Sequence, residues 1–158
     1  MEKYSLKQII KLLGNRKLSE KELVKYYFSR INEYNPTLNA VVSLRSIDEV
    51  FYHLDMLKRS SSGKNRKLLG VPLAIKDLID VEGLPTTYGV PKYKNNIAKK
   101  NSLIVDRLID SGAVIIGKTN TPEWGLGSQT FNRVFGTTTN PYNTSKTAGG
   151  SSGGAAAA

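Results

Sequence analysis

One lysine of the sequence stands where its side chain could act as a base. Lys76 ends the apolar run GVPLAIK, which is suited to a buried strand, so its aliphatic stem leaves the protein interior. Lysine is rarely buried without a partner, and removal from water lowers the pKa of an amine because it favours the neutral form. A neutral amine can accept a proton near neutral pH, so the position predicts general-base chemistry. The alternatives are a lysine that extends from the strand end into solvent, or one that pairs with Asp77.

A second segment, GGSSGG at residues 149–154, carries hydroxyl groups in a glycine-rich setting. Glycine permits backbone conformations and close approaches that other residues do not. The hydroxyls of Ser151 and Ser152 can both donate and accept hydrogen bonds. The alanines of residues 155–158 then favour a helix that packs tightly. By composition alone, a flexible glycine–serine linker stays open as the other interpretation.

A match to the phosphate-loop pattern has to be set aside. Residues 112–119, GAVIIGKT, fit G-x-x-x-x-G-K followed by Ser or Thr. That motif works when a loop after a strand turns its N–H groups inward and then enters a helix. Here the four middle residues favour the strand itself, and Pro122 follows closely, which favours a turn. We therefore expect no nucleotide site.

The sequence offers few residues for histidine, cysteine or metal chemistry. His53 is the only histidine and lies in a polar-flanked helical stretch, where a surface or boundary position is expected rather than a Ser-His-Asp triad. The absence of cysteine excludes a thiol nucleophile, disulfides and Cys-ligated zinc. We expect no metal and no cofactor. The acidic residues that fit solvated helix faces are Asp48, Asp55, Asp106 and Asp110.

The elements that position these residues begin with helices. Ser5 with Gln8 and Ser19 with Glu22 fit capping boxes, and the two helices they start are expected to end at Gly14 and before Pro36. A third helical pattern follows and runs to a polar loop, RSSSGKNRK, which is the best candidate for a mobile connection. The three apolar stripes are Leu6, Ile9, Ile10 and Leu13; Leu23, Tyr27, Ile31 and Tyr34; and Ile47, Val50, Leu54 and Leu57.

After the polar loop the pattern changes from helices to strands. LLGVPLAIKD (68–77) and AVIIGKTN (113–120) predict buried strands, and the helical segment between them, 102–111, is closed by Gly112. A strand, a helix and a strand predict a partly parallel α/β sheet. From Thr121 onward the chain is rich in Gly, Thr, Asn and Pro, and we expect loops that line a site.

Composition indicates a soluble globular protein. The chain has 158 residues, 39% of them hydrophobic and 23% charged, which suits one domain with its own core. We expect that single domain over residues 1–158, helical in 1–60 and α/β in 65–158. The sequence contains no long apolar span and no signal peptide, so we expect a cytoplasmic protein without a membrane partner.

The net charge of +10 invites a nucleic-acid interpretation. The lysines are scattered, no Arg-rich helix is present, and no aromatic residues alternate regularly with the basic ones. A basic surface that confers solubility and weak attraction to polyanions is sufficient, and no specific nucleic-acid partner is expected.

Together, these segments resemble the amidase signature family of Ser-Ser-Lys hydrolases. The matching pieces are GVPLAIKDLIDVEGLPTTYG, then SLIVDRLIDSGAVIIGKTNTPEWGLGSQTFNRVFGTTTNPYN, and then AGGSSGGAAAA. The resemblance covers most of residues 65–158, and the helical first third is also similar to the family. It implies an α/β fold with a mixed sheet covered by helices, of which this chain would be the N-terminal part.

The resemblance also implies roles for individual residues. Lys76 would be the base, and Ser151, next to a cis peptide bond, would pass a proton between the nucleophile and that lysine. Ser152 would support Lys76 by hydrogen bonding. In the family, the attacking serine lies roughly two dozen residues beyond the first serine of this motif, in a turn that forms the oxyanion hole. This sequence ends at Ala158, so we expect an inactive N-terminal fragment that lacks the nucleophile.

The expected function of the complete form is hydrolysis of a small-molecule carboxylic amide to an acid and ammonia or an amine, in a possible homo-oligomer. One alternative is the glutamine-hydrolysing A subunit of the aspartyl/glutamyl-tRNA amidotransferase. TPEWGLGSQTFNRVFGTT is more similar to general amidases than to that subunit, which tends to carry an Asp-Glu-Phe stretch there. Another alternative is a non-catalytic basic remnant that binds acidic partners through its charge.

Overall fold

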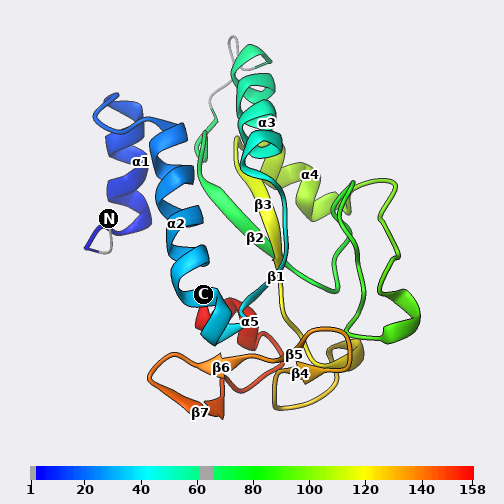
Figure 1. The fold of residues 1–158 in the computed structure, drawn as a ribbon. Helices are drawn as coiled ribbons and strands as arrows, with labels where there is room; N and C mark the ends of the chain where they lie inside the picture. Colours follow the sequence, from blue (N-terminus) through cyan, green and yellow to red (C-terminus); the bar gives the residue numbers. More distant parts are fainter. Residues whose placement is uncertain (1–2, 61–65) are drawn as a thin grey trace.

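The computed structural model describes residues 3–60 and 66–158, so the middle of the polar loop predicted as a mobile connection lies outside the described residues. The longest helices lie in the first part of the chain (Figure 1). The helical elements are α1 (Leu6–Gly14), α2 (Glu20–Leu38), α3 (Ile47–Arg59), the 3-10 turn η1 (Pro91–Tyr93), α4 (Leu103–Asp110), the 3-10 turn η2 (Glu123–Gly125) and α5 (Gly153–Ala157).

The strands of the described residues form one three-stranded sheet and two small ribbons. They are β1 (Val41–Leu44), β2 (Pro72–Lys76), β3 (Val114–Thr119), β4 (Phe131–Asn132), β5 (Gly136–Thr137), β6 (Thr139–Asn140) and β7 (Asn143–Thr147). The main sheet has the order β1-β3-β2, with β2 parallel and β1 antiparallel to β3. The predicted strand, helix and strand are therefore present as β2, α4 and β3, and the fold is mixed α/β.

The central strand β3 explains why helices cover both faces of this sheet. All six of its residues are buried. Val114 and Ile116 pack in a cluster with residues of α2 and α3, whereas Ile115 packs with Val105 of α4. Because successive strand residues point to opposite faces, α2 and α3 cover one face and α4 the other. Burial of each such side chain contributes about 1.5–3 kcal/mol.

The capping boxes predicted at Ser5 and Ser19 are both confirmed. The Ser5 hydroxyl accepts from the Gln8 amide while the Gln8 side chain accepts from the Ser5 amide, and Ser19 exchanges the same two bonds with Glu22. α3 starts with the same device at Ser46, which the apolar stripe alone had not indicated. Each cap satisfies backbone donors that a helix start leaves free, and its loss costs about 1 kcal/mol.

The predicted end of the second helix is wrong. α2 continues through Pro36 to Leu38 and stops at Asn39, which is in the left-handed conformation with φ of 50°. The Asn39 amide donates to the Asn35 carbonyl at 2.7 Å, and the Asn35 side chain accepts from the amides of Ala40 and Val41 at 2.8 Å each. These bonds offset the roughly 3 kcal/mol that proline costs in a helix interior, and they turn the chain directly into β1.

Two further expectations need correction. The first third is not purely helical, because β1 lies between α2 and α3; at four residues it is too short to show a clear alternation. The chain beyond Thr121 is not only loop, because β4–β5 and β6–β7 form two antiparallel ribbons. The turn of the first ribbon is held by the side-chain carbonyl oxygen of Asn132, which accepts from the amides of Val134 and Phe135.

Within the described part of the chain, none of the helices combines the length and the apolar character needed to cross a bilayer.

Candidate functional site

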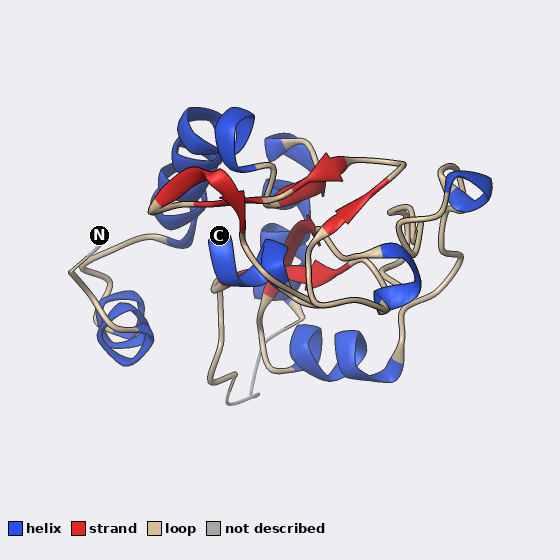
Figure 2. Cartoon of the chain, turned by 90° about the horizontal axis from the view of Figure 1, so that it is seen from below, coloured by secondary structure: helices blue, strands red, loops and turns tan. Residues whose placement is uncertain are grey.

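The structure brings together the three residues that the sequence singled out. Lys76 is the last residue of β2, and its Nζ donates to Ser151 Oγ and to Ser152 Oγ at 2.9 Å each, across 75 and 76 residues of sequence. Ser152 precedes α5, but its hydroxyl does not cap that helix and is left for the lysine. α5 contacts β2 and lies near the end of α2 in Figure 1; Figure 2 shows it near the centre from below.

The surroundings of Lys76 favour its neutral form. The side chain is half-buried, and this desolvation lowers the pKa of Lys76. The alternative in which Lys76 pairs with Asp77 is wrong, because the carboxylate of Asp77 lies against Lys118 instead. An amine that contacts hydroxyls without a facing carboxylate can accept a proton from one of them.

The GGSSGG segment is packed, so its interpretation as a flexible linker is wrong. A cis peptide bond joins Gly150 to Ser151. Gly153 and Gly154 are buried, and a Cβ atom at Gly153 would stand 2.3 Å from Thr130 Oγ1. At Gly154 it would stand 2.3 Å from the Asn120 backbone nitrogen. Glycine is therefore needed here because the segment passes against neighbouring chain, and the alanines form α5 as predicted.

Two threonines fix this segment from the side of the 121–130 loop. Thr130 Oγ1 accepts from the Gly153 amide at 3.0 Å, and Thr121 Oγ1 donates to the Ser151 carbonyl at 3.4 Å. Both threonines have no exposed surface. The loop that the sequence predicted to line a site therefore holds the backbone on both sides of Ser152.

A buried asparagine network, which the sequence analysis missed, supports these threonines. Asn120 follows β3 and donates from Nδ2 to Gly136 O at 3.2 Å and to Thr138 Oγ1 at 3.0 Å. Asn132 Nδ2 donates to Asn120 Oδ1 at 2.7 Å and to Thr121 O at 2.8 Å. Buried amides of this kind are retained only when hydrogen-bonded. The available signal was an asparagine directly after a strand that begins with an apolar run, where a buried polar side chain needs a partner.

The phosphate-loop match is part of the sheet, as predicted. Three of its four middle residues, from Val114 to Ile116, belong to β3, and Lys118 is completely buried instead of facing solvent. The Lys118 amine donates to the carbonyls of Ile79 and Pro85 and to the Thr86 hydroxyl. The three N–H donors of the Lys118 ammonium group therefore all have partners within the protein.

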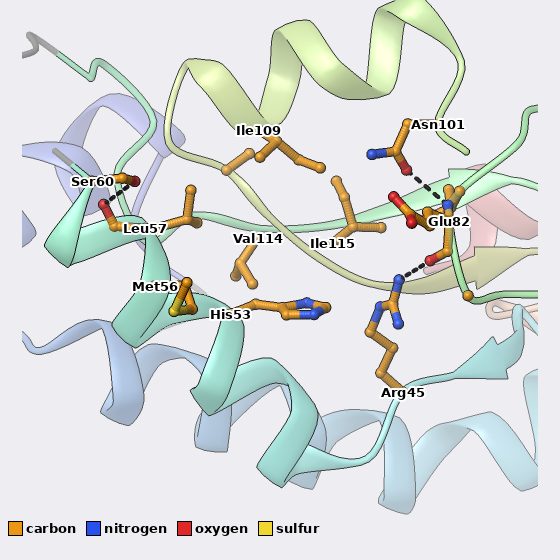
Figure 3. Close-up of a pocket in the computed structure, with 13 residues that line it drawn as sticks. Arg45, His53, Met56, Leu57, Ser60, Glu82, Asn101, Ile109, Val114 and Ile115 are labelled. Carbon is orange, nitrogen blue, oxygen red and sulfur yellow. Dashed lines mark hydrogen bonds between the residues drawn. The ribbon is translucent and has the colours of Figure 1, made fainter. Parts of the chain in front are cut away.

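His53 lies at a cavity of about 480 Å³ between α3, β3 and α4 (Figure 3). Burial and nearby Arg45 lower the pKa of His53. Arg45 donates to the Glu82 carbonyl, and the Glu82 amide donates to Asn101 Oδ1 across the rim. Neither Lys76 nor the two serines line this cavity. His53 is thus half-buried at a boundary, as expected, and is not brought to the lysine.

In residues 3–60 and 66–158, no three His, Asp or Glu side chains come close enough together to hold a metal ion.

Comparison with known proteins places these features in a family. The family model described as Amidase matches residues 22–158. The A subunit of the glutamyl-tRNA(Gln) amidotransferase of Caldanaerobacter subterraneus subsp. tengcongensis is 39% identical over 163 residues, covering 100% of this chain and 33% of that protein. An acylamidase of Rhodococcus erythropolis is 39% identical over 147 residues, covering 92% of this chain and 31% of that protein.

Solved structures give the same result. A bacterial aryl acylamidase, described as belonging to the amidase signature enzymes, superposes with a TM-score of 0.87 and 33% identity over 98% of this chain and 32% of its own. The A subunit of the glutamyl-tRNA(Gln) amidotransferase of Thermotoga maritima gives a TM-score of 0.79 with 28% identity over 98% of this chain and 31% of its own. The chain spans about a third of the length of the relatives it matches. It belongs to the amidase signature family.

Proposed function

We propose that this chain supplies the proton relay of an amide-hydrolysing centre, with Lys76 as the base, Ser151 as the relay and Ser152 as the support of the lysine. The protein that contains it would cleave a carboxylic amide to an acid and ammonia or an amine. The observation that carries the proposal is the pair of 2.9 Å hydrogen bonds from Lys76 Nζ to the two serine hydroxyls.

The proposed proton path starts from these two hydrogen bonds. Neutral Lys76 accepts the proton of Ser151, while Ser151 accepts the proton of a serine that attacks the amide carbonyl. The oxygen–carbon bond of the acyl-enzyme forms, the carbon–nitrogen bond breaks, and the departing nitrogen takes the proton back along the same path. Water then attacks the acyl-enzyme by the same relay, which releases the acid and restores the serine.

The attacking serine lies outside residues 1–158 in this proposal. Among the described residues, only Ser151 and Ser152 offer hydroxyls to Lys76. The coverage of about a third of the matched relatives is consistent with a longer chain that supplies the nucleophile and the oxyanion hole. Loss of a single oxyanion donor already costs about 10²–10³-fold in rate, so the 158 residues alone are expected to be inactive.

The test is ammonia or amine release from a panel of primary amides and anilides, measured on the protein as its own cells produce it. Lys76→Ala should lower kcat/KM by about 10²–10⁴-fold, the range for loss of a general base. Lys100→Ala is the matched control, because Lys100 is exposed and should leave the rate unchanged. Turnover that survives Lys76→Ala would refute the proposed role.

A second candidate is the glutamine-hydrolysing component of a tRNA-dependent amidotransferase. It is supported by the 39% identity to the Caldanaerobacter protein over this whole chain, which equals the identity to the Rhodococcus acylamidase. Glutamine hydrolysis that requires added partner proteins would favour this candidate. Hydrolysis of simple amides without any partner would favour a general amidase.

A further inference from the structure

We propose that the buried ion pair of Asp77 and Lys118 is a positioning device, which fixes the end of β2 so that Lys76 meets Ser151 and Ser152. The inference rests on the proposed function of Lys76. It assigns to the two buried residues a task beyond holding the fold together.

The pair is built as a clamp on one short stretch of chain. Both side chains have no exposed surface, and Lys118 Nζ lies 3.4 Å from Asp77 Oδ1. Lys118 also donates to the Ile79 carbonyl at 2.8 Å and to the Pro85 carbonyl at 3.2 Å. One ammonium group therefore holds both arms of the turn that leaves β2.

The carboxylate holds the same stretch from its other side. Asp77 accepts from the Thr87 amide at 3.1 and 3.3 Å and from the Thr87 hydroxyl. Its backbone carbonyl accepts from the Tyr88 amide at 3.2 Å, and its own amide donates to the Thr119 carbonyl at 3.0 Å. A buried charge is tolerated only when its partners are in place. The ion pair and the backbone groups bonded to it are therefore expected to adopt their positions together.

The pair lies on the opposite face of the sheet from the candidate site. Ile75 is registered against Lys118, and Lys76 against Thr119. Because side chains alternate along a strand, Ile75 and Asp77 point to the face that α4 covers, and Lys76 points away from it. The Lys76 carbonyl also accepts from the amides of the next turn, at residues 78 and 79. Movement of the clamped turn would therefore rotate the strand end that carries the amine.

The first experiment removes both charges, so that no unpaired charge is left inside. The double variant Asp77→Asn/Lys118→Met is made in the form of the protein that its own cells produce, with 13C-labelled lysine. We would follow the Lys76 signals by NMR and assign them with the variant Lys76→Arg. The expected result is loss of the contact between the Lys76 ε-protons and the Ser151 β-protons, together with a rise of the Lys76 pKa toward its ordinary value. A folded double variant that keeps both signals would overturn the proposal.

A milder variant keeps the test decisive if the double variant does not fold. Thr87→Val preserves the side-chain shape and removes one donor to Asp77. It should weaken the same contact and raise the Lys76 pKa in the same direction, and no change would overturn the proposal. Lys21→Met is the matched control, because it breaks the exposed Lys21–Asp55 pair and should leave Lys76 unaffected. These signals do not depend on turnover, so failure of the clamp is distinguishable from failure of the proposed reaction.

Discussion

Lys76 is the last residue of β2 and Lys118 the last but one of the parallel strand β3, and they face opposite sides of one sheet, yet their environments differ. Lys118 has no exposed surface and faces Asp77, two carbonyls and a hydroxyl. Lys76 is half-buried, and its amine donates to two serine hydroxyls. Burial lowers the pKa of both amines. At Lys118 the facing carboxylate of Asp77 raises the pKa and opposes the effect of burial, whereas desolvation is the cause of the shift at Lys76.

Burial of a lysine therefore does not by itself make it a base. A sealed amine that faces a buried carboxylate is held in its charged form by that carboxylate and serves as a structural cation. A half-buried amine beside hydroxyls can exchange a proton with them. In the proposed function, Lys118 therefore holds the fold and Lys76 acts as the base, and the predictions below test that difference.

The largest effect is expected at the sealed lysine. Lys118→Met leaves the Asp77 carboxylate buried without its ion-pair partner, which should lower the free energy of unfolding by about 3–5 kcal/mol. Lys76→Met leaves no buried charge behind and should cost much less. Urea unfolding of both variants checks the difference. Equal losses of unfolding free energy in the two variants would show that the two lysines contribute equally to stability.

The next effect is expected where α5 meets the end of β3. Gly154→Ala places a Cβ atom about where the Asn120 backbone lies, so α5 must move and the variant should lose roughly 1–3 kcal/mol. The contact between Lys76 and the serines should weaken with it. Ala155→Ser, at an exposed position of the same helix, is the control. A crystal structure of Gly154→Ala with α5 in place would contradict the packing argument.

A smaller effect is expected at the support of Lys76. Ser152→Ala removes one of the two hydroxyls that contact the amine, and a hydrogen bond of this type is worth about 0.5–1.5 kcal/mol. We expect kcat/KM for amide hydrolysis to fall by about tenfold, against a much larger fall for Ser151→Ala. If both variants lost activity equally, the separate roles of relay and support would be wrong.

The smallest effect is a pH dependence of stability. Because the pKa of Lys76 is lowered on folding, the unfolded chain binds more protons than the folded one between the folded pKa and the ordinary lysine pKa. The Lys76 contribution to the free energy of unfolding should therefore rise with pH through that window. The difference between wild type and Lys76→Met in urea unfolding at several alkaline pH values isolates it. If the stability difference between wild type and Lys76→Met fell with rising pH, the pKa of Lys76 would be raised on folding, which would contradict the prediction.

Much of the fold could be predicted from local patterns. The boxes at Ser5 and Ser19, the strands that end at Lys76 and Thr119, and the helix between them all follow from capping and periodicity. The continuation of α2 through Pro36 could not be predicted in this way, because it depends on hydrogen bonds made by the side chain of Asn35. β1 and the two ribbons are too short for their pattern to stand out.

The candidate site was predictable only in part. Lys76 and Ser151 lie 75 residues apart, so no local rule brings them together, and their meeting was expected from the resemblance to a family. The Asn120 network and the Asp77–Lys118 pair were not foreseen. Both consist of polar groups whose partners come from distant segments, and such pairing becomes visible only when the chain is folded.

The central claim is that Lys76 acts as a neutral base. Its most direct test is the pH dependence of kcat/KM for amide hydrolysis by the protein as its cells produce it. We expect a rate that rises with pH, levels off above an apparent pKa below the ordinary lysine value of about 10.4, and is lost in Lys76→Ala. A profile with the same inflection and rate in that variant would contradict the account.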